Sequence, residues 1–66
     1  MKLKDIFTLI ACKVLIIETP YGSDTYYKSP SSPFFDNKQV VIEHGEDTIS
    51  GIWAIKKETL KVHTLG

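Results

Sequence analysis

The fold is decided by residues 3–18, whose sequence is LKDIFTLIACKVLIIE. The first part of this stretch spaces its hydrophobic side chains at i, i+3, i+4 and i+7, which is typical of an amphipathic helix. These four side chains are Leu3, Ile6, Phe7 and Ile10. Residues 13–18 then form an aliphatic, β-branched run that is hydrophobic on both faces, as in a central strand covered by a helix. We therefore predict a helix over about residues 3–11 that packs on a sheet begun by residues 13–18.

The rest of the chain is predicted to form further strands separated by turns. A turn at residues 19–23 leads to a second strand over residues 24–28. Pro30 and Pro33 deny the backbone the hydrogen-bond donors of a helix or sheet, so residues 29–37 are predicted to form a loop. Three more strands are expected from the period of two in the remaining sequence. They cover residues 38–44, 48–56 and 59–65.

These elements predict an α+β fold with one amino-terminal helix packed on a four- to five-stranded antiparallel sheet. Short connections after the loop favour a meander, and a small SH3-like barrel is the alternative. At this length the chain forms a single domain, residues 1–66. The core is predicted to contain Leu3, Ile6, Phe7, Ile10, Leu15, Ile17, Val40, Ile42, Trp53, Ile55, Leu60 and Val62.

Composition excludes several classes of protein. Eight basic residues, all lysine, balance eight acidic ones, so no long-range field steers the chain to nucleic acid or to an acidic membrane surface. The longest strongly apolar run, residues 14–17, is far shorter than a membrane span. The amino terminus lacks the small-residue cleavage site of a secretory signal, and the one cysteine, Cys12, suits a reducing compartment. We therefore expect a cytoplasmic protein.

No residues form a convincing catalytic or metal site in the sequence. Cys12 with His44 or His63 is the one nucleophile–base candidate, but free cysteines are commonly buried and a helix carboxyl end raises the pKa of a thiol. Residues 44–47 gather an imidazole and two carboxylates, and with Cys12 or His63 they offer mixed metal ligands. Their spacing matches no compact zinc or calcium signature, so a solvated turn is the preferred interpretation. We predict a non-enzymatic chain with no cofactor and no metal.

The opening residues 1–6, the helix-to-strand step over residues 9–17 and the closing residues 52–62 resemble small uncharacterised proteins encoded by bacteriophages and related mobile elements. Those proteins often begin with a Lys-Asp-Leu-like helix that leads into a Val/Ile strand. The resemblance implies a phage-type accessory protein. It supplies no chemical motif, and Pro30, Pro33 and the pair Phe34-Phe35 depart from the pattern.

Aromatic residues are concentrated in one part of the chain, and they predict a partner-binding site. Five of the seven aromatic residues lie within fifteen positions, and large exposed aromatics are enriched at protein interfaces. They are Tyr21, Tyr26, Tyr27, Phe34 and Phe35. The alternative is that Phe34 and Phe35 fold over the core, and we expect one of the two to be buried and the other exposed.

The leading functional hypothesis is a protein-binding accessory module, an inhibitor or adaptor of a host or phage protein, that uses the aromatic segment or an exposed sheet edge. Its partner is a protein of unknown identity or a second copy of the chain. The alternative is a small nucleic-acid-binding domain that uses surface tyrosines and a basic patch near the carboxyl end. This patch would consist of Lys56, Lys57, Lys61 and His63. Acidic neighbours and the absence of arginine count against it.

Overall fold

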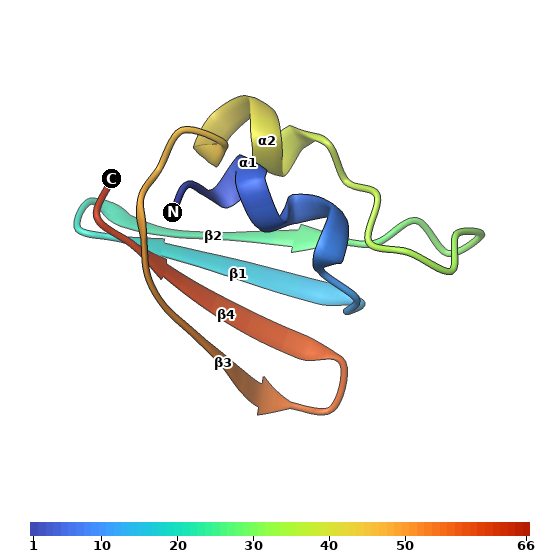
Figure 1. The fold of residues 1–66 in the computed structure, drawn as a ribbon. Coiled ribbons are helices and arrows are strands. Elements are labelled where there is room, and N and C mark those ends of the chain that lie inside the picture. The colour runs from blue at the N-terminus through green and yellow to red at the C-terminus, as the bar shows by residue number, and fades with distance from the viewer.

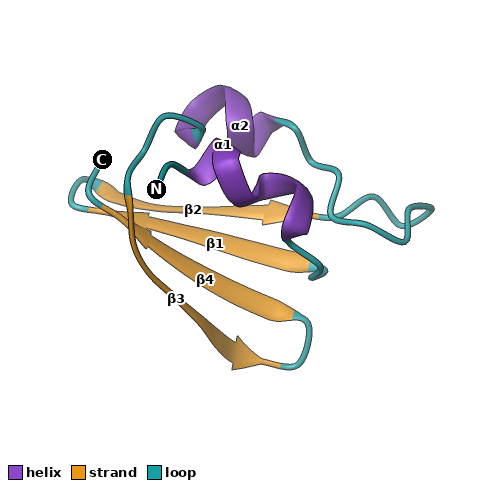
Figure 2. Cartoon of the chain, viewed as in Figure 1, coloured by secondary structure: helices purple, strands orange, loops and turns teal.

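The computed structural model describes residues 1–66 and places a helical layer on one face of a four-stranded sheet, as Figure 1 and Figure 2 show. The elements in chain order are α1 (Leu3–Ile6), the 3-10 turn η1 (Phe7–Leu9), β1 (Val14–Thr19), β2 (Gly22–Tyr27), α2 (Gln39–His44), β3 (Ile49–Lys56) and β4 (Thr59–Thr64). The predicted α+β fold with an amino-terminal helix on a sheet is confirmed. No helix of the structure has the length and apolar character needed to cross a membrane.

The strand order is β2-β1-β4-β3, and the sheet is mixed. β1 pairs antiparallel with β2 and parallel with β4, and β3 pairs antiparallel with β4. The central position predicted for residues 13–18 is confirmed, because β1 has a neighbour on each side. The antiparallel meander is wrong, since the parallel pair β1–β4 separates the two hairpins. The barrel alternative is also wrong, because β2 and β3 remain at two open edges.

The strand predicted over residues 38–44 is wrong, because Gln39–His44 form the helix α2 and Lys38 is its N-cap. β2 and β3 lie at opposite edges of the sheet, so the chain between them must cross over one face, and α2 lies in this crossover (Figure 1). Two residues bracket the helix. Asn37 accepts a hydrogen bond through its side chain from the backbone N–H of Gln39, and Gly45 follows the last helical turn. Such start and stop residues favour a helix over the strand that β-branched Val40 and Val41 favour.

The core lies between the helical layer and the strands β1, β2 and β4. The side chains that are buried from the predicted core are Leu3, Phe7, Ile10, Leu15, Ile17, Val40 and Val62, with Ile6 and Leu60 half-buried against them. The core also takes in Cys12, Tyr26 and Phe35. Phe35 meets Phe7 edge to face, with ring centroids 6.0 Å apart.

Three predicted core residues lie on the surface instead. Ile42 is 75% exposed, because on a helix it points away from the face that buries Val40. Trp53 and Ile55 are about half exposed, at 45% and 50%. Trp53 pairs with Lys61 and so lies on the face of the sheet that carries no helix, and β3 at the edge extends beyond the helical layer (Figure 2).

Candidate functional site

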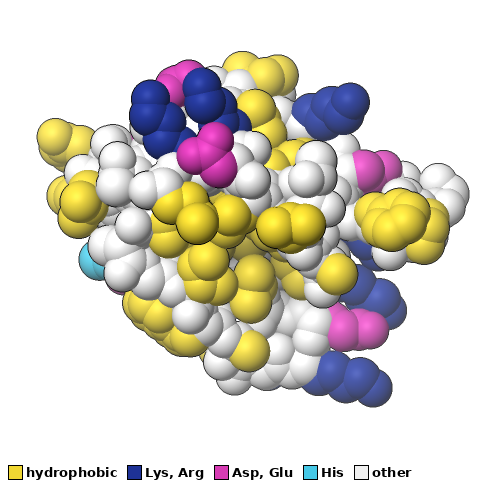
Figure 3. All heavy atoms as spheres, in the orientation of Figure 1, with side chains coloured by type: hydrophobic (Ala, Val, Ile, Leu, Met, Phe, Trp, Pro, Cys, Tyr) yellow, Lys and Arg dark blue, Asp and Glu magenta, His cyan; other side chains and the backbone are white.

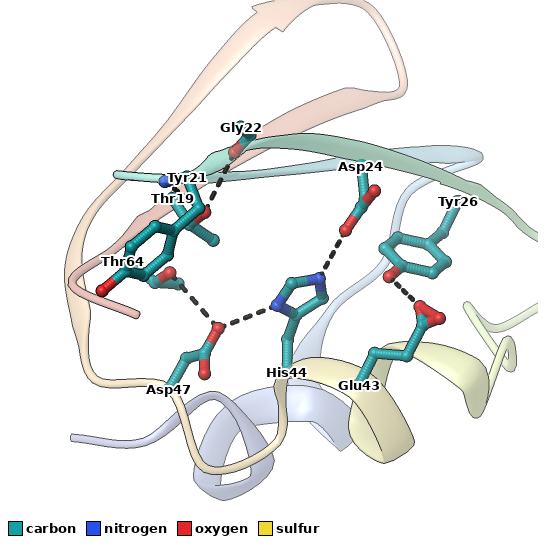
Figure 4. Close-up of polar contacts among 9 residues, drawn as sticks. All are labelled: Thr19, Tyr21, Gly22, Asp24, Tyr26, Glu43, His44, Asp47 and Thr64. Atoms are coloured by element: carbon teal, nitrogen blue, oxygen red, sulfur yellow. Dashed lines mark hydrogen bonds and ion pairs between the residues drawn. The ribbon is translucent and has the colours of Figure 1, made fainter.

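His44, the last residue of α2, has a carboxylate facing each of its ring nitrogens (Figure 4). Its Nδ1 lies 2.8 Å from Asp47 Oδ2 and its Nε2 lies 2.9 Å from Asp24 Oδ2. Burial lowers the pKa of His44, but the hydrogen bonds to Asp47 and Asp24 outweigh burial, and the net effect is a raised pKa. Both contacts are satisfied only when both nitrogens carry a proton, so the arrangement favours the imidazolium.

The cluster draws its side chains from three parts of the fold. Asp24 pairs with Ile17 in the sheet and therefore lies on the face that the helices cover. Asp47 follows α2 and accepts a second hydrogen bond from the Thr64 hydroxyl on β4, at 3.4 Å. The side chain of His44 is only 11% exposed. The cluster thus ties β2, α2 and β4 together at one end of the sheet.

Glu43, the neighbour of His44, is held by a hydrogen bond from the Tyr26 hydroxyl to its Oε2, at 2.6 Å (Figure 4). Burial raises the pKa of Tyr26, and the hydrogen bond to Glu43 raises it further, so the hydroxyl keeps its proton and donates it. Tyr26 was predicted to contact a partner, but its ring is buried in the core. Its hydroxyl positions the Glu43 carboxylate beside His44.

An open pocket of about 430 Å³ lies beside these side chains. Nine residues line it, and one of them is hydrophobic. Asp24, Glu43 and His44 place one ligand atom each within 4.8 Å of the others, which makes them the set in this chain that can hold a metal ion. Such a polar pocket suits a charged or strongly hydrated species better than an apolar ligand.

The sequence analysis grouped residues 44–47 with Cys12 or His63 as possible metal ligands. Only some of these side chains lie together in the structure. Glu46 turns away to Lys2 and Lys4, each 2.7 Å from its carboxylate, and their hydrogen bonds hold the pKa of Glu46 at about 2. The hydroxyl of Ser50 contacts Nδ1 of His63 on the other face of the sheet.

Cys12 is not brought to a base. It is buried, burial raises the pKa of its thiol, and neither histidine hydrogen-bonds to it. Sequence reasoning missed Asp24, because assigning residues 38–44 to a strand left no reason for His44 to lie over β2.

The predicted aromatic segment does not form one surface. Tyr26 and Phe35 are buried, whereas Tyr21, Tyr27 and Phe34 are exposed. The expectation that one of Phe34 and Phe35 is buried and the other exposed is confirmed. Tyr21 directly precedes β2, whereas Phe34 lies in the loop that follows the other end of that strand.

Three further exposed hydrophobic side chains lie on β3. Ile52, Trp53 and Ile55 are each between 44% and 50% exposed. Figure 3 shows hydrophobic side chains gathered across the face between the helical layer and β3. A β-carbon at Gly51 would lie 2.7 Å from a Trp53 ring carbon, so only glycine lets this ring lie along its own strand.

The predicted basic patch is divided between two settings. Lys56 and Lys57 are exposed at the end of β3, whereas Glu18 engages the other two members. Lys61 Nζ lies 2.7 Å from one Glu18 oxygen, and His63 Nε2 lies 3.5 Å from the other. The hydrogen bond from Lys61 lowers the pKa of Glu18, so this carboxylate stays charged and offsets the patch.

We expect oligonucleotides to bind no tighter than about 10⁻⁴–10⁻⁶ M at physiological salt, because few phosphates can be neutralised. A salt titration with single-stranded and duplex oligonucleotides, followed by Trp53 fluorescence, measures this affinity. Lys61→Gln serves as the control for binding at the patch. Sub-micromolar affinity that falls steeply with salt and is lost in Lys61→Gln would contradict the expectation.

Comparison of the chain with protein-family models, with curated proteins and with solved structures finds no match. The resemblance to phage-encoded proteins therefore stays a prediction, and the functional argument depends on the geometry of the chain itself.

Proposed function

We propose that this chain is a non-enzymatic protein-binding module whose binding element is the edge strand β3. The observation that supports the proposal is an edge strand with exposed hydrophobic side chains on both of its faces. Ile52 pairs with Val62 and lies on the helical side of the sheet, whereas Trp53 pairs with Lys61 and lies on the opposite side. A strand with this pattern is typical of the interior of a sheet.

β3 also has few of the features that keep edge strands from pairing, and its lysine, Lys56, is its last residue. Residues 49–55 contain no charged side chain and no proline, and β3 is the longest strand of the sheet at eight residues. Natural edges are commonly blocked by lysine, proline or short length. β3 carries a register irregularity near each end, but the segment from Ile52 to Ala54 between them is regular. This segment can accept a further strand.

The strand at the other edge of the sheet, β2, is polar where β3 is apolar. β2 carries the short polar sequence Gly-Ser-Asp-Thr before its two tyrosines, and Asp24 lies in the middle of it. A charged residue at an edge opposes strand addition. The contrast between the two edge strands supports β3 as the one that binds a partner strand.

The partner that fits β3 is an extended segment with apolar side chains at alternate positions. Backbone hydrogen bonds would supply affinity, and contacts with Ile52 and Trp53 would supply specificity. An inhibitor or adaptor of a host or phage protein would bind its target in this way. The β3 strand of a second copy of the chain is itself an extended segment with exposed apolar side chains. Self-association would therefore use the same edge of β3.

A peptide with the sequence of residues 48–57, TISGIWAIKK, is a suitable probe. We expect the protein to bind the labelled peptide, and Ile52→Lys to weaken binding at least about tenfold, or 1.4 kcal/mol. Fluorescence anisotropy measures the peptide affinity, and sedimentation velocity over a range of concentrations measures self-association.

Ile42→Lys is the matched control, because Ile42 is exposed on α2 away from β3. It should bind the peptide as the unaltered protein does, and thermal melting should show that both variants are folded. A protein that stays monomeric and does not bind the peptide would contradict the proposal. Equal weakening by Ile42→Lys would contradict the assignment to β3.

A further inference from the structure

We propose that Asp24, Glu43 and His44 form a binding site for a divalent transition metal ion, with zinc as the ion that fits the ligand set. The site lies at the polar pocket and not at β3, so this inference is independent of the proposed protein binding. It depends on the placement of ligand atoms, on the charge of the cluster and on the contacts that orient each ligand.

The ligand atoms are close enough for a single ion. His44 Nε2 and Asp24 Oδ2 are 2.9 Å apart, and Glu43 completes a set that lies within 4.8 Å. Zinc binds imidazole nitrogen and carboxylate oxygen at about 2.0–2.2 Å, so neighbouring ligands of a tetrahedral ion lie roughly 3.3 Å apart. Asp24 and Glu43 are exposed, so their side chains have room to rotate and adjust the oxygens to this spacing. The fourth position opens to the pocket, where a water molecule completes the coordination.

The charge of the cluster favours a dication. Asp24, Glu43 and Asp47 bring three carboxylates to one imidazolium, and the nearby lysines Lys2 and Lys4 are paired with Glu46 instead. The cluster therefore keeps a net charge of about −2 in a partly desolvated position. A bound dication neutralises that charge.

The contacts around the ligands match those that orient ligands in metal sites. Histidine ligands almost always donate their second ring N–H to a carboxylate or carbonyl, and Asp47 accepts from Nδ1 of His44 at 2.8 Å. This contact fixes the proton on Nδ1 and leaves Nε2 for the ion. The Tyr26 hydroxyl holds one oxygen of Glu43 in the same manner.

Metal binding replaces the proton on His44 Nε2 with the metal ion. The proton on Nε2 passes to solvent, the nitrogen lone pair binds the ion, and Asp24 changes from accepting that N–H to ligating the metal. The imidazole ligand selects zinc over magnesium, because magnesium prefers an all-oxygen, octahedral environment.

The test is a calorimetric titration of zinc sulfate into chelator-stripped protein at pH 7.5 in a non-coordinating buffer. We expect one zinc ion per chain and a rise in melting temperature with zinc. His44→Gln and Asp24→Asn should each weaken zinc binding at least about tenfold, because each removes a ligand. Asp24 is exposed at the surface, so Asp24→Asn remains informative if His44→Gln fails to fold.

Glu46→Gln is the matched control, since it removes a carboxylate two residues from His44 that faces Lys2 and Lys4. It should leave zinc affinity unchanged. Asp47→Asn keeps all three ligands but alters the contact to Nδ1, and it should weaken binding about 10–100-fold. On addition of zinc, the ¹⁵N resonance of His44 Nε2 should move and that of His63 Nε2 should not.

The proposal is overturned if zinc gives no saturable binding at millimolar concentration. It is equally overturned if Asp24→Asn and Glu43→Gln both retain full affinity, or if the zinc-dependent resonance belongs to His63. Magnesium at the same concentration should neither raise the melting temperature nor compete with zinc.

Discussion

Phe35→Ala should destabilise the protein by about 3–5 kcal/mol, as large-to-small changes at buried aromatic residues do. Phe35 is 4% exposed and its ring meets Phe7 edge to face across the core. A single core in a domain of this size supplies only roughly 3–5 kcal/mol in total, so the variant should be largely unfolded at 25 °C.

Phe34→Ala is the matched control, because it is the same change at the next residue. Phe34 is 69% exposed, and surface changes of this kind are usually within about 0.5 kcal/mol of neutral. Urea unfolding followed by circular dichroism measures both variants. Equal destabilisation by the two changes would show that the whole segment belongs to the core.

Val40→Asp should unfold the protein, whereas Ile42→Asp should leave its stability within roughly 0.5–1 kcal/mol of the unaltered chain. A charge at Val40 would be fully buried with no partner, which costs more than this small core can offset. Ile42 lies on the solvent side of α2, and an aspartate there stays hydrated.

This pair of variants distinguishes a helix from a strand at residues 38–44. In a strand the two side chains lie two residues apart on one face, so both changes would be equally damaging. Thermal melting compares their stability, and backbone chemical shifts of the Ile42→Asp variant should be helical over residues 39–44. Two unfolded variants would contradict the helix.

Local sequence patterns predicted the elements whose periodicity was unambiguous. The helical spacing of Leu3 and Phe7 located the first helix, but the helix predicted over residues 3–11 is shorter in the structure, where α1 ends at Ile6 and the 3-10 turn η1 ends at Leu9. The alternation of Leu60 and Lys61 identified the inward and outward faces of β4. In these segments local propensity and tertiary packing favour the same structure. The sequence analysis was therefore most accurate at the two strands that occupy the centre of the sheet.

The error at residues 38–44 arose because β-branched residues favour a strand locally, whereas the path of the chain requires a crossover there. Val40 is buried in either conformation, so burial alone does not distinguish them. Trp53 was assigned to the core because its neighbours are apolar, and only the pairing of β3 with β4 shows which face it occupies.

The candidate sites depend on contacts distant in the sequence. Asp24 meets His44 across twenty residues, through a helix that the period-two pattern had assigned to a strand. No spacing rule connects these two residues, and metal signatures in sequences are recognised by short intervals. The edge position of β3 likewise follows from the strand order, which only the parallel pairing of β1 with β4 establishes.

That parallel pairing also determines what an incompletely folded chain exposes. β1 and β4 are neighbours in the sheet, although 39 residues, from position 20 to position 58, separate them in the chain. Until residues 59–64 join the sheet, β1 has only β2 beside it, and β3 has no strand to pair with. A chain in which β4 has not yet docked therefore exposes one open edge of β1 and the whole of an unpaired β3, and such strand edges are prone to aggregation and to chaperone binding.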